Sequence, residues 1–402
     1  MKITFFLYTD IRAGRGTEEI VLNLVKHRPP NVSISIVQTD FFDRIRLSEE
    51  QVRGVLEQCE VIKFHSNIPH HSFKTTYGHY LDRVYLDLIK RPIRRDLKSL
   101  RNTSTLEKIR DTDIVYLLHN EYAIFFGKTG IPVIGSDQTD SISGILKKQV
   151  FYKKVYYKIL YILYYRNING CQIFPSNKDI LEKMPFRYKF VMPNGVDTNI
   201  FYPKFDEKHD KVKFLFVGAL NSGKGLDILL PLIRSLNMPS AEFHIYGSGP
   251  LEEEIKETKN IKYHGDINED NKAKLYRECD VFIYPSRVDS FGIVVLEALA
   301  SGLYVLLSDL LKGNFDDFEG KYLEYLPRNV DAFKNRVIEI LNNRDTITHD
   351  KKEEYKYVKE HFDWKVISEG FYSNMTRFYE ESEKSNLGNV SGISEQSEKL
   401  IW

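Results

Sequence analysis

Residues 284–302 read YPSRVDSFGIVVLEALASG, and this stretch decides the fold class. The apolar residues Val281–Tyr284 predict a short buried strand that ends where the loop begins. The loop contains a proline and two serines, and Gly292 opens an apolar helix that runs to about Ala300. A buried strand followed by a loop and a helix is the repeating unit of a parallel sheet that is covered on both faces.

The same alternation of strand and helix patterns occurs along the rest of the chain. In the C-terminal half the predicted strands are Val212–Val217, Glu242–Tyr246, Ile261–Tyr263, Val281–Tyr284 and Tyr304–Leu307. In the N-terminal half they are Lys2–Tyr8, Ser33–Gln38, Val61–Phe64, Ile114–His119, Pro132–Ser136, Cys171–Phe174 and Phe190–Met192, with helical patterns at Thr17–Lys26, Ser72–Ile89 and Ile145–Tyr165. We therefore predict an α/β protein of two doubly wound parallel-sheet domains, whose ligands bind at the carboxyl ends of the strands, in the cleft between the domains.

Domain boundaries follow from changes in composition. The stretch PNGVDTNIFYPKFDEKHD, residues 193–210, combines turn residues with charge and predicts a linker. We expect an N-terminal domain over residues 1–193 and a C-terminal domain over residues 194–363. An amphipathic helix follows over residues 364–381, and the polar, serine-rich residues 382–402 are expected to be a disordered tail.

Composition narrows the class of protein. The chain has 402 residues, of which 42% are hydrophobic and 28% charged, as in a globular protein, and its formal net charge of +1 favours no nucleic-acid partner. Three distant cysteines and scattered histidines predict neither a disulfide framework nor a metal site. The first apolar run ends at Asp10 without a cleavage-type sequence, and no run is long enough to cross a bilayer, so a cytoplasmic location is expected.

The loop and helix in residues 284–302 carry the clearest chemistry. The amides of Ser290, Phe291 and Gly292 are predicted to be unpaired donors at a helix start, suited to a phosphate or to sugar hydroxyls. Glu297 lies within the helix, where a carboxylate can accept two hydrogen bonds from a ribose diol. Asp289 precedes the helix and is free to meet sugar hydroxyls. Each acid taken alone is explained more simply, by helix capping at Asp289 and a solvated surface position for Glu297.

These residues resemble the retaining glycosyltransferases of family 4, which have the GT-B fold of two Rossmann-like domains facing a central cleft. The family motif is a glutamate, seven residues and a second glutamate around Phe-Gly. Here Asp289 and Glu297 hold the two acidic positions, and Phe291 and Gly292 stand between them. Aspartate is shorter than the first glutamate of the family by one methylene.

The stretch FLFVGALNSGKGLDILL, residues 214–230, resembles the first strand and loop of the family's donor domain. The resemblance implies that Gly218 and Lys224 meet the donor diphosphate. The alternative for Lys224 is an exposed lysine at a helix start, but a glycine on each side leaves room for a ligand beside the backbone. Ala219 stands where the family usually has an arginine, which weakens the phosphate clamp, and Arg287 is a candidate to compensate.

Further segments match the family in the same order. FHIYGSGPLEEEI, residues 243–255, resembles the strand and Gly-x-Gly-Pro loop near the nucleotide, which implies donor contacts at Gly247 and Gly249. In the next unit the backbone after Gly265, at Asp266, is implied to meet the base. PNGVD, residues 193–197, resembles the family's hinge sequence. FDWKVISEGFY, residues 362–372, resembles the terminal helix that packs back on the first domain.

The N-terminal half resembles an acceptor domain more loosely. Residues 14–18, GRGTE, resemble the family's glycine loop and place Gly16 near the donor phosphate or the acceptor. His119 ends a predicted strand, and the resemblance makes it a catalytic candidate facing the acceptor. A histidine satisfied at the sheet edge is an equal alternative. Asp137 and Gln138 stand where many relatives carry a histidine that contacts the reacting sugar, which leaves that role open.

Three other patterns are interpreted as structural. Asp111-Thr-Asp113 imitates a metal-binding acidic motif but precedes a strand, which favours a solvated turn. The glycine loop with Asp40 imitates a dinucleotide fingerprint, but Glu19 replaces the third glycine. Residues 147–167 combine lysines with many tyrosines, and residues 91–101 add further cations. Such patches suit an anionic membrane surface, although an ordinary crossover helix is the simpler interpretation.

The resemblance implies a retaining, metal-independent glycosyltransferase of hexosyltransferase type. Its donor would be a UDP- or GDP-linked sugar with no further cofactor, and its acceptor would supply a hydroxyl group. The basic and aromatic residues 147–167 add the expectation of a glycan or lipid-linked glycan as acceptor, with peripheral association at the inner face of a membrane. The first alternative, supported by Ala219 and Asp289, is a catalytically weak partner subunit of the same fold that binds a nucleotide sugar. The second is a sugar-nucleotide epimerase.

Overall fold

The computed structural model describes residues 1–7, 9–14, 16–39, 47–64, 105–126, 129–136, 167–182, 184, 186–205, 210–236, 238–265 and 269–384. Several predictions concern residues outside these ranges: the helices Ser72–Ile89 and Ile145–Tyr165, the basic segment 91–101 and nearly all of 147–167, Asp40, Asp137, Gln138 and Asp266. The chain divides into two compact units, which are described separately.

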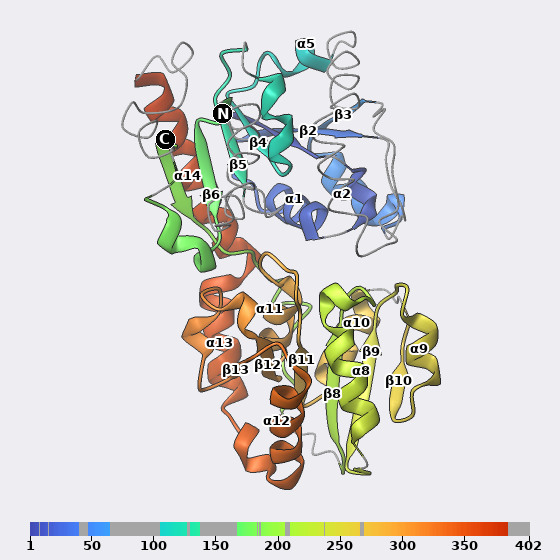
Figure 1. Cartoon of the computed structure of the whole chain (residues 1–402). Coiled ribbons are helices and arrows are strands. Elements are labelled where there is room, and N and C mark those ends of the chain that lie inside the picture. The colour runs from blue at the N-terminus through green and yellow to red at the C-terminus, as the bar shows by residue number, and fades with distance from the viewer. Residues whose placement is uncertain are drawn as a thin grey trace, which may run out of the picture. The chain divides into compact units, whose positions relative to one another are not determined.

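The first unit comprises Met1–Ile173, Ile180–Phe190 and Ser368–Trp402. Its seven-stranded sheet has the order β3-β2-β1-β4-β5-β6-β7, and strands β1 to β6 pair in parallel (Figure 1). The strands are β1 (Lys2–Phe6), β2 (Ser33–Thr39), β3 (Glu60–Phe64), β4 (Ile114–Leu117), β5 (Val133–Ser136), β6 (Gly170–Ile173) and β7 (Tyr188–Val191), with helices α1 (Gly16–Lys26), α2 (Glu49–Leu56) and α5 (Thr105–Ile109). The strand order reverses between β1 and β4, so the loops after these two strands lie at the topological switch point.

Helix α14 (Trp364–Lys384) packs against the sheet of this unit (Figure 1). The ring centroid of Phe371 lies 5.9 Å from that of Phe5 and 5.1 Å from that of Tyr116. The Tyr372 hydroxyl donates to the Leu24 carbonyl of α1 at 2.6 Å. The helix continues to Lys384, so the first residues of the predicted tail are helical, and the rest of that tail lies outside the described ranges.

The second unit comprises Phe174–Asp179 and Val191–Ile367. Its six-stranded sheet is parallel throughout, in the order β10-β9-β8-β11-β12-β13 (Figure 1). The strands are β8 (Val212–Val217), β9 (Ala241–Tyr246), β10 (Ile261–Tyr263), β11 (Val281–Tyr284), β12 (Tyr304–Ser308) and β13 (Leu323–Leu326). The helices are α8 (Leu226–Ser235), α9 (Glu252–Glu257), α10 (Glu269–Arg277), α11 (Ile293–Ala300), α12 (Val330–Asn342) and α13 (Lys351–Phe362).

These two sheets confirm the predicted fold class of two parallel-sheet, Rossmann-like domains. Strands β8, β10 and β11 have the predicted bounds. All four residues of β11 are buried, and such a strand leaves a continuous apolar run in the sequence. Strand β13 was not predicted. It lies at the sheet edge, and only Leu323 of its four residues is fully buried, so its sequence LEYL lacks an apolar run.

The described part of the predicted linker is packed into the second unit. Val196 and Phe201 are buried in its core. The Val196 amide donates to the Phe362 carbonyl at 2.9 Å, and the Trp364 amide donates to the Val196 carbonyl at 3.1 Å. The apolar positions within this polar stretch therefore belong to the core of the second unit.

Candidate functional site

The strand order of the second sheet reverses between β8 and β11, and the loops after these two strands are joined to each other. The amides of Arg287 and Val288 both donate to the Gly223 carbonyl at 2.9 Å. Gly225 lies so close to the second loop that a Cβ atom there would be 2.1 Å from the Pro285 carbonyl oxygen. The switch point is thus one rigid structure that holds Lys224 and Asp289.

An ion pair joins these two predicted site residues. Lys224 Nζ lies 2.7 Å from Asp289 Oδ2 and donates to the Val288 carbonyl at 3.2 Å. Tyr284 donates its hydroxyl to the same carboxylate oxygen at 2.7 Å, and the Ser290 amide donates to Asp289 Oδ1 at 2.9 Å. Asp289 therefore already has partners, and the amide of Ser290 is paired. The structure thus differs from the predictions of a free Asp289 carboxylate and an unpaired Ser290 amide.

The amides of Phe291 and Gly292, which follow Ser290, agree with the prediction of unpaired donors at the helix start. Gly292 is the N-cap of α11, and no side chain caps the helix there. Within the described ranges, no group accepts a hydrogen bond from the amide of Phe291 or Gly292. The Phe291 side chain is buried against Phe174 and Phe315, with ring centroids 5.0 and 5.1 Å away. Phe291 can therefore contribute only its backbone to an anion site.

Glu297 is buried within α11, with 1% of its surface exposed. Lys272 Nζ of α10 lies 2.6 Å from its Oε1, and the Tyr276 hydroxyl donates to its Oε2 at 2.7 Å. The alternative of a solvated surface position is wrong. A ribose diol would have to share this carboxylate with Lys272 and Tyr276.

The glycine loop after β9 touches the loop after β8. A Cβ atom on Gly247 would lie 1.9 Å from the Gly218 carbonyl oxygen, and one on Gly249 would lie 2.6 Å from that of Leu220. The Leu220 amide donates to the Ser248 carbonyl at 3.0 Å. The structure thus brings the three predicted glycines together at the carboxyl ends of β8 and β9.

In the first unit, the predicted residues follow the two strands at its own switch point. Gly16 is exposed and begins α1 after β1, while His119 lies beyond the end of β4 as the N-cap residue of the turn Asn120–Phe125. Buried Glu18 also lies here and accepts a hydrogen bond from the Thr9 hydroxyl. The sequence analysis missed Glu18.

Two further residues that the sequence analysis did not assign lie in the second unit, namely Tyr284 and Lys272. Tyr284 is the last residue of the predicted strand Val281–Tyr284, but nothing in the sequence indicated that its hydroxyl contacts Asp289. Lys272 precedes Tyr276 by four residues on one helix, and this spacing places both side chains on one face. That spacing was a usable signal.

Of the three patterns interpreted as structural, the structure describes Asp111-Thr-Asp113 in full. Asp113 lies in the turn before β4, and its Oδ2 accepts the Lys2 amide at 2.7 Å. Among the residues that the structure describes, no cluster of three or more His, Cys, Asp or Glu side chains is suited to a metal ion. In the same part of the chain, no helix has both the length and the apolarity required to span a bilayer.

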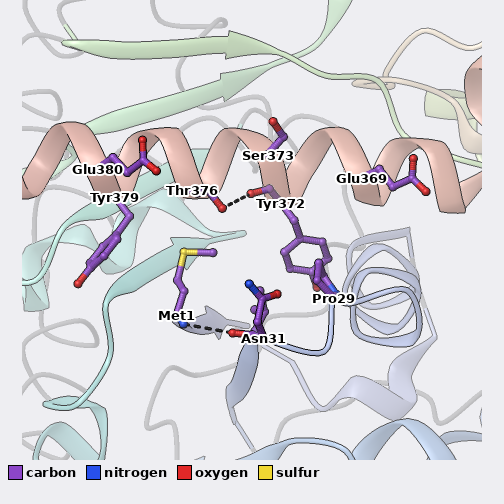
Figure 2. A pocket seen from close by; sticks show the side chains of 10 residues that line it. Met1, Pro29, Asn31, Glu369, Tyr372, Ser373, Thr376, Tyr379 and Glu380 are labelled. Carbon is purple, nitrogen blue, oxygen red and sulfur yellow. Dashed lines mark hydrogen bonds between the residues drawn. The ribbon is translucent and has the colours of Figure 1, made fainter.

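A hollow of about 490 Å³ in the first unit lies away from these residues. Figure 2 shows Tyr372 and Tyr379 of α14 lining it together with Met1, Pro29 and Asn31. It contains none of the predicted site residues. Met1 precedes β1, so the hollow is at the amino ends of the strands, whereas Gly16 and His119 follow their carboxyl ends.

Comparison with known proteins supports one family. Residues 197–359 match the family model of glycosyl transferases group 1. The chain is 26% identical over 313 residues to an uncharacterized glycosyltransferase of Methanocaldococcus jannaschii, an alignment that covers 73% of this chain and 84% of that protein. It is 26% identical over 226 residues to the sulfoquinovosyl transferase of Arabidopsis thaliana, covering 50% of this chain and 42% of that protein.

A solved structure agrees with the fold. The protein HepE from Anabaena, solved in complex with UDP and glucose, has a TM-score of 0.64 to this chain at 13% identity, covering 93% of this chain and 99% of that one. This likeness establishes the GT-B fold. Residues 197–359 thus match the family glycosyl transferases group 1, and the chain is similar to a glycosyltransferase over 73% of its length.

Proposed function

We propose that this protein is a retaining, metal-independent glycosyltransferase. It moves a hexose from a UDP- or GDP-linked sugar to a hydroxyl group of a glycan or lipid-linked glycan. The observation that carries the proposal is the meeting of Lys224 and Asp289 at 2.7 Å beside the open amides of Phe291 and Gly292. A cation, an acid and helix-start donors at a topological switch point suit a sugar diphosphate.

The donor diphosphate takes the place of Asp289 as the partner of Lys224. Lys224 is 26% exposed and flexible, so its ammonium group can turn from the carboxylate to a phosphate oxygen. The amides of Phe291 and Gly292 add fixed donors from the start of α11. As the bond to the sugar breaks, these groups stabilise the charge that develops on the leaving diphosphate.

The nucleoside and the sugar bind on either side of the diphosphate. Glu297 accepts the ribose hydroxyls after Lys272 gives up part of its contact, and Asp289 accepts a hydroxyl of the transferred sugar. The complex of HepE with UDP and glucose supports a nucleoside diphosphate sugar as the donor. Retention of configuration is the outcome expected from the resemblance to retaining enzymes.

The acceptor is assigned to the first unit, where Gly16 and His119 follow neighbouring strands. A lipid-linked acceptor agrees with the basic and aromatic composition of residues 147–167, which would associate with the inner face of a membrane. We expect enrichment of the protein on vesicles containing anionic phospholipid. The same binding to neutral vesicles would contradict an electrostatic association.

The deciding experiment compares Lys224→Ala with the wild type in donor hydrolysis and in transfer to a panel of acceptors, with UDP- and GDP-linked sugars. Lys224→Ala should lower transfer by about a hundredfold, as for the loss of one preorganised donor. Lys274→Ala is the matched control, because Lys274 is 66% exposed on α10 of the same unit and should retain activity. Equal transfer by Lys224→Ala and the wild type would refute the proposed site.

A second candidate function is a catalytically weak subunit that binds a nucleotide sugar. Ala219, which stands where the family usually has an arginine, is exposed beside the candidate site and supplies no cation. Calorimetric binding of UDP or GDP without turnover on any acceptor would favour this candidate.

A further inference from the structure

We infer that Tyr284 is a positioning residue, which holds the Asp289 carboxylate in place for the sugar when Lys224 turns to the diphosphate. This inference rests on the proposed function, and its experiment is arranged so that each can fail separately. The structural basis of the inference is one acceptor atom, Asp289 Oδ2, that two donors share. Asp289 Oδ2 accepts from Lys224 Nζ and from the Tyr284 hydroxyl, each at 2.7 Å.

The Tyr284 ring is fixed from several sides. It is the last residue of β11 and has 2% of its surface exposed. Its ring stacks on Phe282, with centroids 5.7 Å apart and an interplanar angle of 22°. Phe216 of β8 lies against it at 5.9 Å. The hydroxyl therefore has one direction, set by the sheet, and that direction is toward Asp289.

The other donors to Asp289 differ in mobility. Lys224 is a long side chain with 26% exposure, and the proposed mechanism requires it to leave. The Ser290 amide donates to the other carboxylate oxygen of Asp289, Oδ1, at 2.9 Å. Once Lys224 has turned away, Tyr284 is the described donor that holds Oδ2. A carboxylate held at both oxygens keeps one orientation, whereas one held at a single oxygen can rotate.

The tyrosine also remains a donor throughout the useful pH range. Burial, with the negative charge of Asp289 beside it, raises the pKa of the Tyr284 hydroxyl well above its usual value. It therefore stays protonated at neutral pH. Its ring also lies 5.8 Å from Lys224 Nζ, within the range of a cation–π contact.

The test is a double-mutant cycle with Tyr284→Phe and Asp289→Asn in the full chain. Tyr284→Phe removes one hydrogen bond to a charged group, so it should lower kcat about tenfold or more. The Kd of UDP or GDP alone should not change, because the tyrosine acts on the sugar through Asp289. In the Asp289→Asn background, Tyr284→Phe should have no further effect on kcat.

Tyr304→Phe is the matched control. Tyr304 is a buried tyrosine in the neighbouring strand β12, and its hydroxyl donates to Glu324, away from both loops. It should keep wild-type kcat, while thermal unfolding of both variants reports any loss of stability. A wild-type kcat for Tyr284→Phe, or an equal loss with and without Asp289, would overturn the inference.

The outcomes separate the two proposals. If the proposed function is wrong, the wild type transfers no sugar and Lys224→Ala changes nothing. If only the positioning role is wrong, the wild type is active and Lys224→Ala is impaired. Tyr284→Phe then either keeps the wild-type kcat or lowers kcat equally with and without Asp289→Asn.

Discussion

Lys272 Nζ lies 2.6 Å from Glu297 Oε1, and the two side chains are 9% and 1% exposed. The pair joins α10 to α11, and the Tyr276 hydroxyl donates to the other oxygen of Glu297. Two buried charges cost a large desolvation energy, which their mutual attraction and hydrogen bonds offset. Glu297 therefore has a structural role in addition to the ribose contact proposed for it.

The first prediction concerns this buried pair. Lys272→Met should lower the free energy of unfolding by about 3 kcal/mol or more, because it leaves the Glu297 charge buried without its partner. The double variant Lys272→Met/Glu297→Gln should lose less than the single one. Urea unfolding followed by circular dichroism measures both. Lys274→Met, at a position 66% exposed, is the control, and a loss no larger than that of the control would contradict the prediction.

The second prediction concerns the contact between the two glycine loops. Gly247 has a φ of 136°, and a Cβ atom there would lie 1.9 Å from the Gly218 carbonyl oxygen. Gly247→Ala should separate the loops and weaken UDP or GDP binding in calorimetry. Gly320→Ala is the control, because φ is 81° but no heavy atom lies within 4 Å, so it tests backbone strain alone. In Gly320→Ala that strain should lower the free energy of unfolding by about 1–2 kcal/mol. Gly247→Ala should lower it by more than the control does.

The third prediction is a gain of affinity. Ala219 is exposed in the loop after β8, so a longer side chain can be accommodated there. Ala219→Arg adds a cation beside the candidate diphosphate site and should tighten UDP or GDP binding about tenfold, as a charge-assisted hydrogen bond does. Ala219→Gln should leave the Kd near the wild-type value. Equal Kd values for the arginine and glutamine variants would argue that the diphosphate binds elsewhere.

The fourth prediction concerns pH and rests on a second buried pair. His349 Nε2 lies 2.9 Å from Glu354 Oε2, with 6% and 0% of the side chains exposed. Burial raises the pKa of Glu354 to about 7, although His349 opposes the shift. For His349, burial disfavours the charged form, but the Glu354 carboxylate outweighs it and raises the pKa.

Both groups bind their protons more tightly in the folded protein than in the unfolded chain. Their stabilising contribution is therefore complete at low pH and is lost as the pH rises, for Glu354 between its ordinary pKa of 4.5 and about 7. Over this range the free energy of unfolding should fall by roughly 2–3 kcal/mol from this carboxyl group. Glu354→Gln should flatten the decline in urea unfolding measured from pH 5 to 8. Glu360→Gln, at a position 55% exposed on the same helix, should retain it.

Much of the second sheet could be predicted because its strands are buried on both faces. Val281–Tyr284 is a continuous apolar run, Val212–Val217 is apolar apart from Lys213, and both are strands with these bounds. The edge strand Leu323–Leu326 was missed, since its half-covered residues do not follow that pattern. In residues 193–205 the prolines and glycine predicted a linker, and the sequence did not indicate that Val196 and Phe201 would be buried.

The sequence by itself determined which residues follow which strand, so that Lys224 and Asp289 were each placed in a loop after a predicted strand. Local chain geometry and burial control these features, and both leave a periodic trace in the residues. Only the tertiary structure decided the partners: Asp289 with Lys224 and Tyr284, and Glu297 with Lys272. Lys224 and Asp289 are 65 residues apart, and Lys272 and Glu297 are 25 apart. Contacts at such separations arise from the packing of whole strands and helices, which brings side chains together independently of their order along the chain.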